Sequence, residues 1–505
     1  MCSSDLETKI DKLVYNNEKN IDKGGNATDV LRKVPMVTVD LDGNVMLQGT
    51  SNVKVLINNK PSSIMATTVA DAMKMIPADE IEKVEVITSP SAKYDAEGTG
   101  GIINIITKKK NMEGVSGSVN VGLGTRSSNI YGSINYNHNR MSIGLNAGGF
   151  GYLGLGNLNS TRVSEKTVYQ SGDNTNWGAG PFGQLNFDYD ISSKDNVSAS
   201  FRLNGFFNGM NGDIKNTISV LDSNISYINS TNSITGGLSY DANADYKHKF
   251  KKEDQEFTLS AQYTNNNRDV DYTSEFSEST IPIPNEKSQN NSVNKEATYQ
   301  ADYTHPFTKK TSLEAGAKTI LREVVSEYDY QKYDAMQGIY VEDTSRNNDF
   351  DYLQNIYAGY LQVATGYKRW GFKLGGRYEK TDIEGKFQKG IPGFTSDYDN
   401  LIPYTTLSYS NLGKYSFKLS YTQRIQRPSM TYLNPYVNNS DPTNISYGNP
   451  DLEPETSNSF ELGCNLFKSF GSINTSIYHR FTNNAIESYR FIRSEEHTSE
   501  LQSPY

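Results

Sequence analysis

Hydrophobic and polar residues alternate along most of the chain after Gly114. In residues 183–191 every odd position is glycine or a large apolar residue, and every even position is polar. The same alternation recurs in residues 197–204, 238–247 and 257–264. A period of two predicts β-strands that have one apolar face and one polar face.

The connections between these runs alternate in length. Short turns are expected near residues 139–140, 192–196, 251–255, 306–311, 368–369, 411–413 and 467–470, and long polar connections near 151–180, 208–236, 266–295, 326–353, 384–398 and 425–455. Short turns on one rim and long loops on the other are typical of a transmembrane antiparallel β-barrel. The runs give about fifteen strands of roughly 10–14 residues before Ile492, long enough to cross a bilayer when tilted.

The alternation also predicts which side chains face lipid and which face the barrel lumen. We expect Leu185, Phe187, Tyr189, Val197, Ala199, Phe201 and Leu203 to face lipid, and Gln184, Asn186, Asp188, Ser198, Ser200 and Arg202 to face the lumen. Tyr246, Phe250, Tyr367 and Tyr409 lie near strand ends and could form an interfacial aromatic girdle. In the alternative, a soluble β-sandwich, these rings would pack in a core, but the loop pattern does not favour a sandwich.

Residues 7–112 have a different pattern, in which helices and strands are mixed. Short helices are expected at Val30–Val34 and Val69–Ile76, a further turn at Ala78–Ile81, and strands at Val37–Val39, Val45–Leu47, Val53–Ile57, Glu82–Ile87 and Ile102–Thr107. We expect Val84–Ile87 and Ile102–Ile106 to pair as core strands of a four-stranded sheet, because both are rich in β-branched apolar residues. Glu85 and Asn104 interrupt these runs, so each should find a polar partner.

The composition agrees with a large β-protein and excludes several other classes. The chain has 505 residues with 35% hydrophobic residues, 34 Tyr, 20 Phe and 41 Gly. Such an aromatic content is too high for a disordered chain, and no run of 18 apolar residues exists that would form a membrane-spanning helix. The net charge of −9 argues against nucleic-acid binding.

Both ends of the chain look foreign to the fold. Residues 1–6 and 493–505 resemble translated sequencing adapters, and we exclude them from the analysis of the fold. We therefore expect the sequence to be a fragment cut at both ends. Cys464 is then the only thiol, so no disulfide is expected.

The chain carries little that points to catalysis or to a cofactor. None of the five His residues stands at metal-ligand spacing to another His or to Cys, so we expect no metal site. Neither a Gly-x-Ser-x-Gly motif nor a phosphate-binding loop occurs, and the glycines at 98, 100 and 101 favour a tight turn. We therefore expect neither an enzyme nor a cofactor-binding protein.

Several segments resemble one known family. The plug-like segments are DVLRKVPMVTVDLDGNVMLQGTSNVKVLINNKPS from Asp29 and IPADEIEKVEVITSPSAKYDAEGTGGIINIITKK from Ile76. PYTTLSYS from Pro403, YTQRIQRPSMTYLNPY from Tyr421 and GNPDLEPETSNSFELG from Gly448 resemble a late part of the barrel. Together these segments resemble the TonB-dependent outer-membrane receptors, and their sequences are most similar to receptors of the Bacteroidetes type.

Three positions depart from the pattern of that family. Met36 stands where the family usually has Gly, Gln48 where it usually has Arg, and Asp95 where Gly is common. The Gln48 departure weakens the expectation of a plug–barrel ion pair at that position.

The resemblance implies the architecture and the partners. It implies a plug at residues 7–112 inside an outer-membrane β-barrel at residues 113–492. Plugged transporters of this kind have 22 strands. With about fifteen strands present, we expect an open sheet, with the gap between the strand near Val115–Gly124 and the strand near Ser472–Arg480. The implied partners are the TonB–ExbB–ExbD energy-transducing complex, an extracellular ligand and outer-membrane lipid. The TonB box is expected before residue 7.

The implied function is import of a scarce solute, energised through TonB, in a Gram-negative outer membrane. The candidate ligand-binding residues lie at the plug apices: Asn58, Asn59, Lys60, Lys93, Tyr94, Asp95 and Glu97. Two alternatives remain open at this stage. One is a passive porin or adhesin, which would conduct without TonB, and the other is a soluble β-enzyme, which would fractionate with soluble proteins.

Overall fold

The computed structural model describes most of the chain between Leu6 and Ser488. Within this span it leaves out residues 9–11, 18–24, 41–43, 52, 58–59, 62–72, 74–75, 77, 99, 109–112, 164–166, 221–222, 345, 388–391, 412–414, 436–445 and 469–470. The predicted helix at Val69–Ile76 lies almost entirely outside the described residues, as does the whole of the C-terminal adapter-like segment.

The N-terminal region forms a small α/β unit around a six-stranded sheet. The sheet has the order β1 (Leu6–Thr8), β2 (Leu13–Asn16), β7 (Ile81–Ile87), β8 (Ile102–Thr107), β5 (Lys54–Ile57) and β6 (Lys60–Pro61). A hairpin of β3 (Val37–Val39) and β4 (Val45–Leu47), the helix α1 (Ala27–Leu31) and the 3-10 turn η1 (Ala78–Glu80) accompany it. Apolar side chains from all these parts share one buried core. The prediction of four strands was wrong, because β1 and β6 are too short to show a periodic pattern.

The two predicted core strands pair as expected. β7 and β8 are antiparallel, with Glu85 directly opposite Asn104. Asn104 Nδ2 donates a hydrogen bond of 3.0 Å to Glu85 Oε2, and Lys12 Nζ lies 2.8 Å from Glu85 Oε1. The side chains of Glu85 and Asn104 are both buried. The two polar interruptions therefore satisfy each other, which confirms the expectation that each has a partner.

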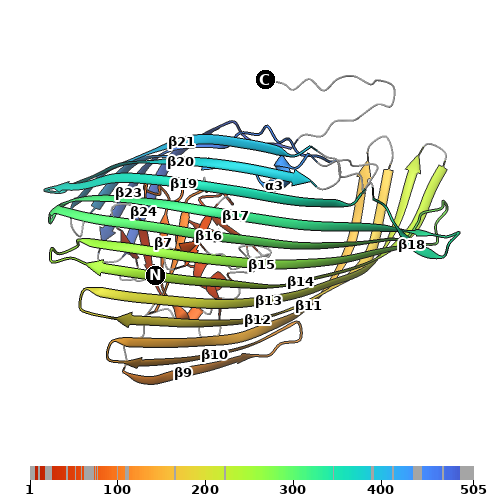
Figure 1. Ribbon diagram of the computed structural model, residues 1–505, viewed down its shortest axis with the longest axis horizontal. Helices are drawn as coiled ribbons and strands as arrows, with labels where there is room; N and C mark the ends of the chain where they lie inside the picture. The colour runs from red at the N-terminus through yellow and green to blue at the C-terminus, as the bar shows by residue number, and fades with distance from the viewer. Residues whose placement is uncertain are drawn as a thin grey trace.

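The rest of the chain is one antiparallel sheet that curves around the N-terminal unit (Figure 1). Its strands are β9 (Gly114–Gly122), β10 (Ser127–His138), β11 (Met141–Val163), β12 (Thr167–Asp190), β13 (Asp195–Val220), β14 (Ser223–Lys249), β15 (Glu256–Ser277), β16 (Glu286–Thr308), β17 (Thr311–Asp334), β18 (Ile339–Glu342), β19 (Asn348–Tyr367), β20 (Trp370–Phe387), β21 (Phe394–Asn411), β22 (Tyr415–Gln426), β23 (Glu455–Lys468) and β24 (Gly471–Asn483). Each pairs with the next along the chain, except that β18 only flanks β17, which pairs directly with β19.

The sheet is open among the described residues. Its path runs from β9 to β24 without a pairing between these two strands. Fifteen strands lie on the path, which matches the expected count and the expected position of the gap. Among the described residues, no helix is long and apolar enough to cross a membrane.

The predicted long loops were largely wrong. Residues expected to form loops, such as 151–180 and 208–236, continue instead as paired strands of 23–27 residues. These segments are rich in Asn, Ser, Thr and Gly on both faces. In these segments the strands extend beyond the lipid-facing band. The backbone hydrogen bonds between neighbouring strands continue there, because they do not depend on which side chains the two faces carry. Only the connection between β22 and β23, which contains α3 (Met430–Leu433), is long as predicted.

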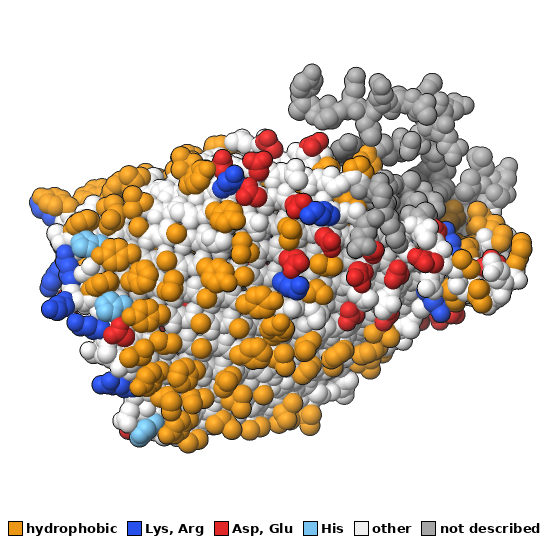
Figure 2. Space-filling view, viewed as in Figure 1, with side chains coloured by type: hydrophobic (Ala, Val, Ile, Leu, Met, Phe, Trp, Pro, Cys, Tyr) orange, Lys and Arg blue, Asp and Glu red, His pale blue; other side chains and the backbone are white. Residues whose placement is uncertain are grey.

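The two faces of the sheet are assigned as the alternation predicts. Leu185, Phe201 and Leu203 on β12 and β13 are exposed on the outside, at 48%, 45% and 39% of their surface. The predicted lumenal side chains line an internal cavity: Gln184, Asn186, Asp188, Ser198, Ser200 and Arg202. Hydrophobic side chains form a broad band on the outer surface (Figure 2). This band is the surface that faces hydrocarbon.

The assignment of the two faces predicts that β13 tolerates a charged side chain at lumenal positions but not at lipid-facing positions. Leu203→Arg on β13 should destabilise the folded barrel by about 2–4 kcal/mol, because the charge meets hydrocarbon. Ser198→Lys on the same strand should have little effect, because Ser198 Oγ faces the lumen near Asp245 Oδ2 at 3.4 Å. Urea unfolding in lipid vesicles measures the free energy of unfolding of each variant. Equal destabilisation by the two variants would contradict the assignment of the outer and lumenal faces.

Candidate functional site

The loop between β7 and β8 forms the plug apex, at residues 88–101. Gly98 and Gly101 have positive φ angles of 103° and 106°. A Cβ atom on Gly101 would lie only 2.8 Å from the Ile87 carbonyl oxygen, so no larger residue fits this turn. The turn lets the loop leave the sheet and return to β8 within a few residues.

The plug apex is joined to the barrel wall by backbone hydrogen bonds. The Ile425 N–H on β22 donates to the Ala96 carbonyl at 3.0 Å, and the Gly98 N–H donates to the Ile425 carbonyl at 3.3 Å. Arg424 Nη2 donates to the Glu97 carbonyl at 2.7 Å. The loop thus forms a short parallel bridge with the wall, which fixes its height in the lumen.

Asp95 at the plug apex is surrounded by three cations. Its carboxylate lies 2.7 Å from Lys54 Nζ on β5, 2.8 Å from Lys318 Nζ on β17 and 3.3 Å from Arg377 Nη2 on β20. The Asp95 side chain is 9% exposed. Burial alone would raise the pKa of this carboxyl, but the charges of Lys318, Lys54 and Arg377 outweigh burial and hold its pKa well below the ordinary value. Asp95 is therefore ionised and binds the plug to two barrel strands.

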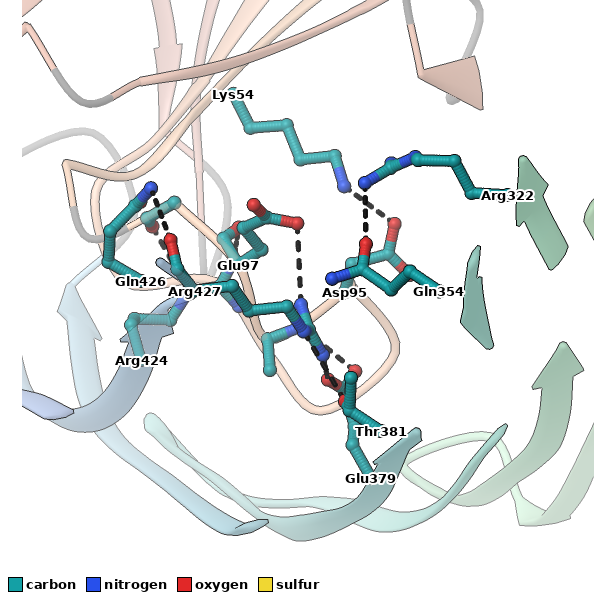
Figure 3. A network of polar contacts seen from close by, with 12 residues as sticks. Lys54, Asp95, Glu97, Arg322, Gln354, Glu379, Thr381, Arg424, Gln426 and Arg427 are labelled. Carbon is teal, nitrogen blue, oxygen red and sulfur yellow. Dashed lines mark hydrogen bonds and ion pairs between the residues drawn. The ribbon is translucent and has the colours of Figure 1, made fainter. Parts of the chain in front are cut away.

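A second carboxylate pair continues the cluster along the wall (Figure 3). Glu379 on β20 forms ion pairs with both Arg377 and Arg427, and accepts a hydrogen bond of 3.2 Å from the Ala96 N–H. Arg427 Nη1 also lies 3.3 Å from Glu97 Oε2. Burial would raise the pKa of Glu97, but the nearby Arg427, Lys54 and Arg322 charges lower it instead. We call Asp95, Glu97, Lys54, Lys318, Arg377, Glu379 and Arg427 the apex cluster.

A smaller contact lies at the start of the same loop. Thr88 Oγ1 and Ser89 Oγ donate hydrogen bonds of 2.6 and 2.9 Å to Glu461 Oε2 on β23. Lys418 Nζ on β22 lies 3.3 Å from the same oxygen. The plug apex is therefore attached to the wall mainly along β17 and β20–β23.

An open pocket of about 610 Å³ lies against the outer side of the apex cluster. Its walls are polar and apolar side chains of β16, β17 and β19, such as Arg322 and Ile356, and its floor includes Asp95 and Glu97. Arg322 on β17 donates from Nε and Nη2 to Glu296 at 2.9 and 2.7 Å, and from Nη1 to Gln354 at 2.7 Å. We call this space the outer pocket. Its cations are each paired with a carboxylate, so it offers hydrogen-bond donors and acceptors without a large net charge.

A larger cavity of about 1190 Å³ separates the plug from the wall formed by β10–β16. We call it the inner cavity. It extends from Asp95 and Lys318 at the plug apex to Arg140 and Lys247 near the short turns. On this side the plug touches the wall through Glu80, which bonds to Tyr131 on β10 and, at 3.4 Å, to Asn146 on β11. Lys54 and Asp95 border both the outer pocket and the inner cavity.

The structure brings together only part of the predicted site. Asp95 and Glu97 belong to the apex cluster, whereas Lys93 and Tyr94 line the inner cavity. Lys60 lies in the short strand β6, and Asn58 and Asn59 fall outside the described residues. Gln48 is uncharged, and its backbone carbonyl accepts a hydrogen bond of 3.1 Å from the Tyr478 hydroxyl on β24.

The barrel half of the apex cluster was missed by the sequence analysis. Lys318, Arg377 and Glu379 occupy inward positions of their strands, where a charged residue is unremarkable in a wet lumen. Their burial, at 7%, 2% and 1% exposure, follows from the plug lying against them. Charged residues at inward positions were the available signal, but nothing in the alternation indicated which of them the plug covers. Among the described residues, no group of three or more His, Cys, Asp or Glu side chains could hold a metal ion.

Comparison with known proteins agrees with this geometry. Residues 248–504 match the outer membrane protein beta-barrel family, and residues 13–102 match the TonB-dependent receptor plug domain. The fold resembles the alcaligin receptor FauA from Bordetella pertussis, with 13% identity, a TM-score of 0.57, and coverage of 94% of this chain and 71% of that one. It also resembles the ferric citrate transporter FecA, with 12% identity, a TM-score of 0.59, and coverage of 94% and 70%. For the Serratia marcescens hemophore receptor HasR the identity is 11%, the TM-score 0.62, and the coverage 94% and 73%. The chain belongs to the outer membrane protein β-barrel family and, with its plug domain, is a TonB-dependent receptor of the Gram-negative outer membrane.

Proposed function

We propose that this receptor binds a hydrophilic solute in the outer pocket and passes it through the inner cavity. The observation that carries the proposal is the Lys54–Asp95 ion pair, which borders both spaces. Polar groups predominate around the inner cavity, and the outer pocket combines charged and amide side chains with apolar ones, which suits a solute rich in hydroxyl, amide or carboxylate groups. The candidate residues Asp95 and Glu97 then contact the solute from below, and Lys93 and Tyr94 lie on its later path.

In this proposal the apex cluster keeps the two spaces separate at rest. Removing one partner from a buried ion pair destabilises a protein by about 3–5 kcal/mol, because the remaining charge is left without compensation. Asp95 has three such partners, so thermal motion alone rarely frees the loop. A pull on the plug by TonB, energised by ExbB and ExbD, supplies the work that separates Asp95 from Lys318 and Arg377.

The first prediction concerns closure of the barrel at rest. Asp95→Asn removes the charge that holds Lys54, Lys318 and Arg377 around the apex, so it should raise conductance in planar bilayers at least about tenfold. Arg32→Gln also changes one charge of the plug, but Arg32 is exposed and borders neither space, so this control should conduct like the wild type. Equal conductance of all three proteins would contradict a closing role for Asp95.

The second prediction concerns pH. The pKa of Asp95 in the folded protein is lowered, so the ionised carboxylate stabilises the seated plug fully above the ordinary carboxyl pKa of about 3.9. This stabilisation is lost as the pH falls through the lower pKa of the folded state. Hydrogen exchange at the Ala96 and Gly98 amides, corrected for intrinsic rates, should therefore show equal protection at pH 7 and pH 5. A tenfold loss of protection at pH 5 would contradict an ionised, tightly paired Asp95.

The passive porin or adhesin is the competing function. It requires conductance by the wild-type protein without TonB, whereas active import requires a closed barrel under those conditions. We expect a strain lacking the receptor and a strain lacking TonB to share a growth defect on the nutrient that supplies the solute. A defect that appears only in the strain lacking the receptor would favour the passive function.

A further inference from the structure

Seven basic side chains lie on four short turns at one end of the barrel. They are Lys194 between β12 and β13, Lys251 and Lys252 between β14 and β15, Lys309 and Lys310 between β16 and β17, and Lys368 and Arg369 between β19 and β20. All seven are exposed, and the only acidic residues on these four turns are Glu253 and Asp254. Basic side chains gather along this end of the molecule in Figure 2. We call these seven residues the basic collar.

The charge of the basic collar is not neutralised by the described part of the protein. No member forms an ion pair with a carboxylate among the described residues. Lys252 Nζ donates to the Phe307 carbonyl at 3.3 Å, and Arg369 Nη1 donates to the Tyr409 hydroxyl at 3.4 Å. These contacts hold the cations beside neighbouring turns and leave donors free for an external anion.

Large apolar side chains adjoin the basic collar on the outer surface. Ile191, Phe250, Phe307, Tyr367 and Trp370 flank the collar turns in sequence and are 38–71% exposed. Several of these rings pack against neighbours, with centroids 4.6 Å apart for Phe250 and His248 and 4.9 Å apart for Trp370 and Tyr409. A surface that is apolar on one side and cationic on the other matches the boundary between acyl chains and phosphates.

The position of the basic collar agrees with the thickness of a bilayer. On the outer face of β17 the first carboxylate after the collar is Glu323, thirteen residues beyond Lys310. Thirteen residues span roughly 40 Å along a strand, or roughly 30 Å across the membrane at the usual tilt. That is about the thickness of the hydrocarbon layer. The basic collar therefore lies at the depth of the phosphates of one leaflet.

We propose that the basic collar binds the phosphate groups of anionic phospholipids in the periplasmic leaflet. Short turns mark the periplasmic rim of such barrels, which assigns the leaflet. Each exposed Lys or Arg near an anionic membrane surface adds attraction that falls off within a Debye length. An acidic soluble protein is the other possible occupant, but the adjoining apolar side chains favour lipid, because they would be exposed to water beside a soluble partner.

Spin-labelled lipids test this proposal directly. The receptor in phosphatidylcholine bilayers receives trace spin-labelled phosphatidylglycerol or phosphatidylcholine, and electron paramagnetic resonance measures the immobilised fraction of each. We expect phosphatidylglycerol to be preferred about fivefold at low salt, with the preference falling towards one in 0.5 M NaCl. The variant Lys251→Gln/Lys252→Gln/Lys309→Gln/Lys310→Gln should lose most of the preference.

A matched variant controls for net charge. Arg268→Gln/Lys295→Gln/Lys380→Gln/Lys386→Gln removes the same number of cations from parts of the strands remote from the collar and should keep the preference. Heat-dependent mobility on gels shows that each variant is folded. The proposal is overturned if the folded wild type shows no preference for phosphatidylglycerol, which would leave an acidic soluble partner as the occupant. It is also overturned if the two variants lose the preference equally.

Discussion

The burial of Asp95 between the plug and the barrel is the constraint on which the closed state of this receptor depends. A carboxylate that leaves water needs compensating charge, and Lys54, Lys318 and Arg377 supply it from one plug strand and two barrel strands. Because Lys318 and Arg377 belong to the barrel, their ion pairs with Asp95 form only when the plug is seated. The same atoms that satisfy Asp95 therefore fix the position of the plug.

The attachment of the plug apex is one-sided. Asp95, Ala96 and Ser89 contact β17 and β20–β23, whereas on the side towards β10–β16 the inner cavity lies beside the apex, and Glu80 connects the plug to β10 and β11. A plug apex held along one wall can move without separating from every strand. This asymmetry explains how a folded domain can fill the lumen and still leave a continuous polar space from the apex to the periplasmic rim.

The barrel wall is governed by a different constraint, the contrast between hydrocarbon and water. Where the outer face meets lipid, apolar residues predominate at outward positions and polar residues at inward positions. Beyond the lipid both faces are wet, so the alternation fades while the hydrogen-bonded ladders of β11–β17 continue. Charges return at both edges of the apolar band, mainly cations at the short turns and carboxylates such as Glu323 on the other side.

The sequence by itself determined the strands that meet lipid, their inward and outward faces, and the pairing of β7 with β8. The first two follow from a period of two, which is a local property of the chain, and the pairing follows from two runs rich in β-branched apolar residues. The antiparallel register that places Glu85 opposite Asn104 was decided by the structure. The sequence did not determine the length of the strands beyond the membrane, because polar residues on both faces look the same in a loop and in a wet strand. Nor did it identify Lys318, Arg377 and Glu379, since any inward charge is acceptable in a wet lumen. Only the seating of the plug decides which of those charges lose water, and this depends on contacts between residues more than 220 positions apart.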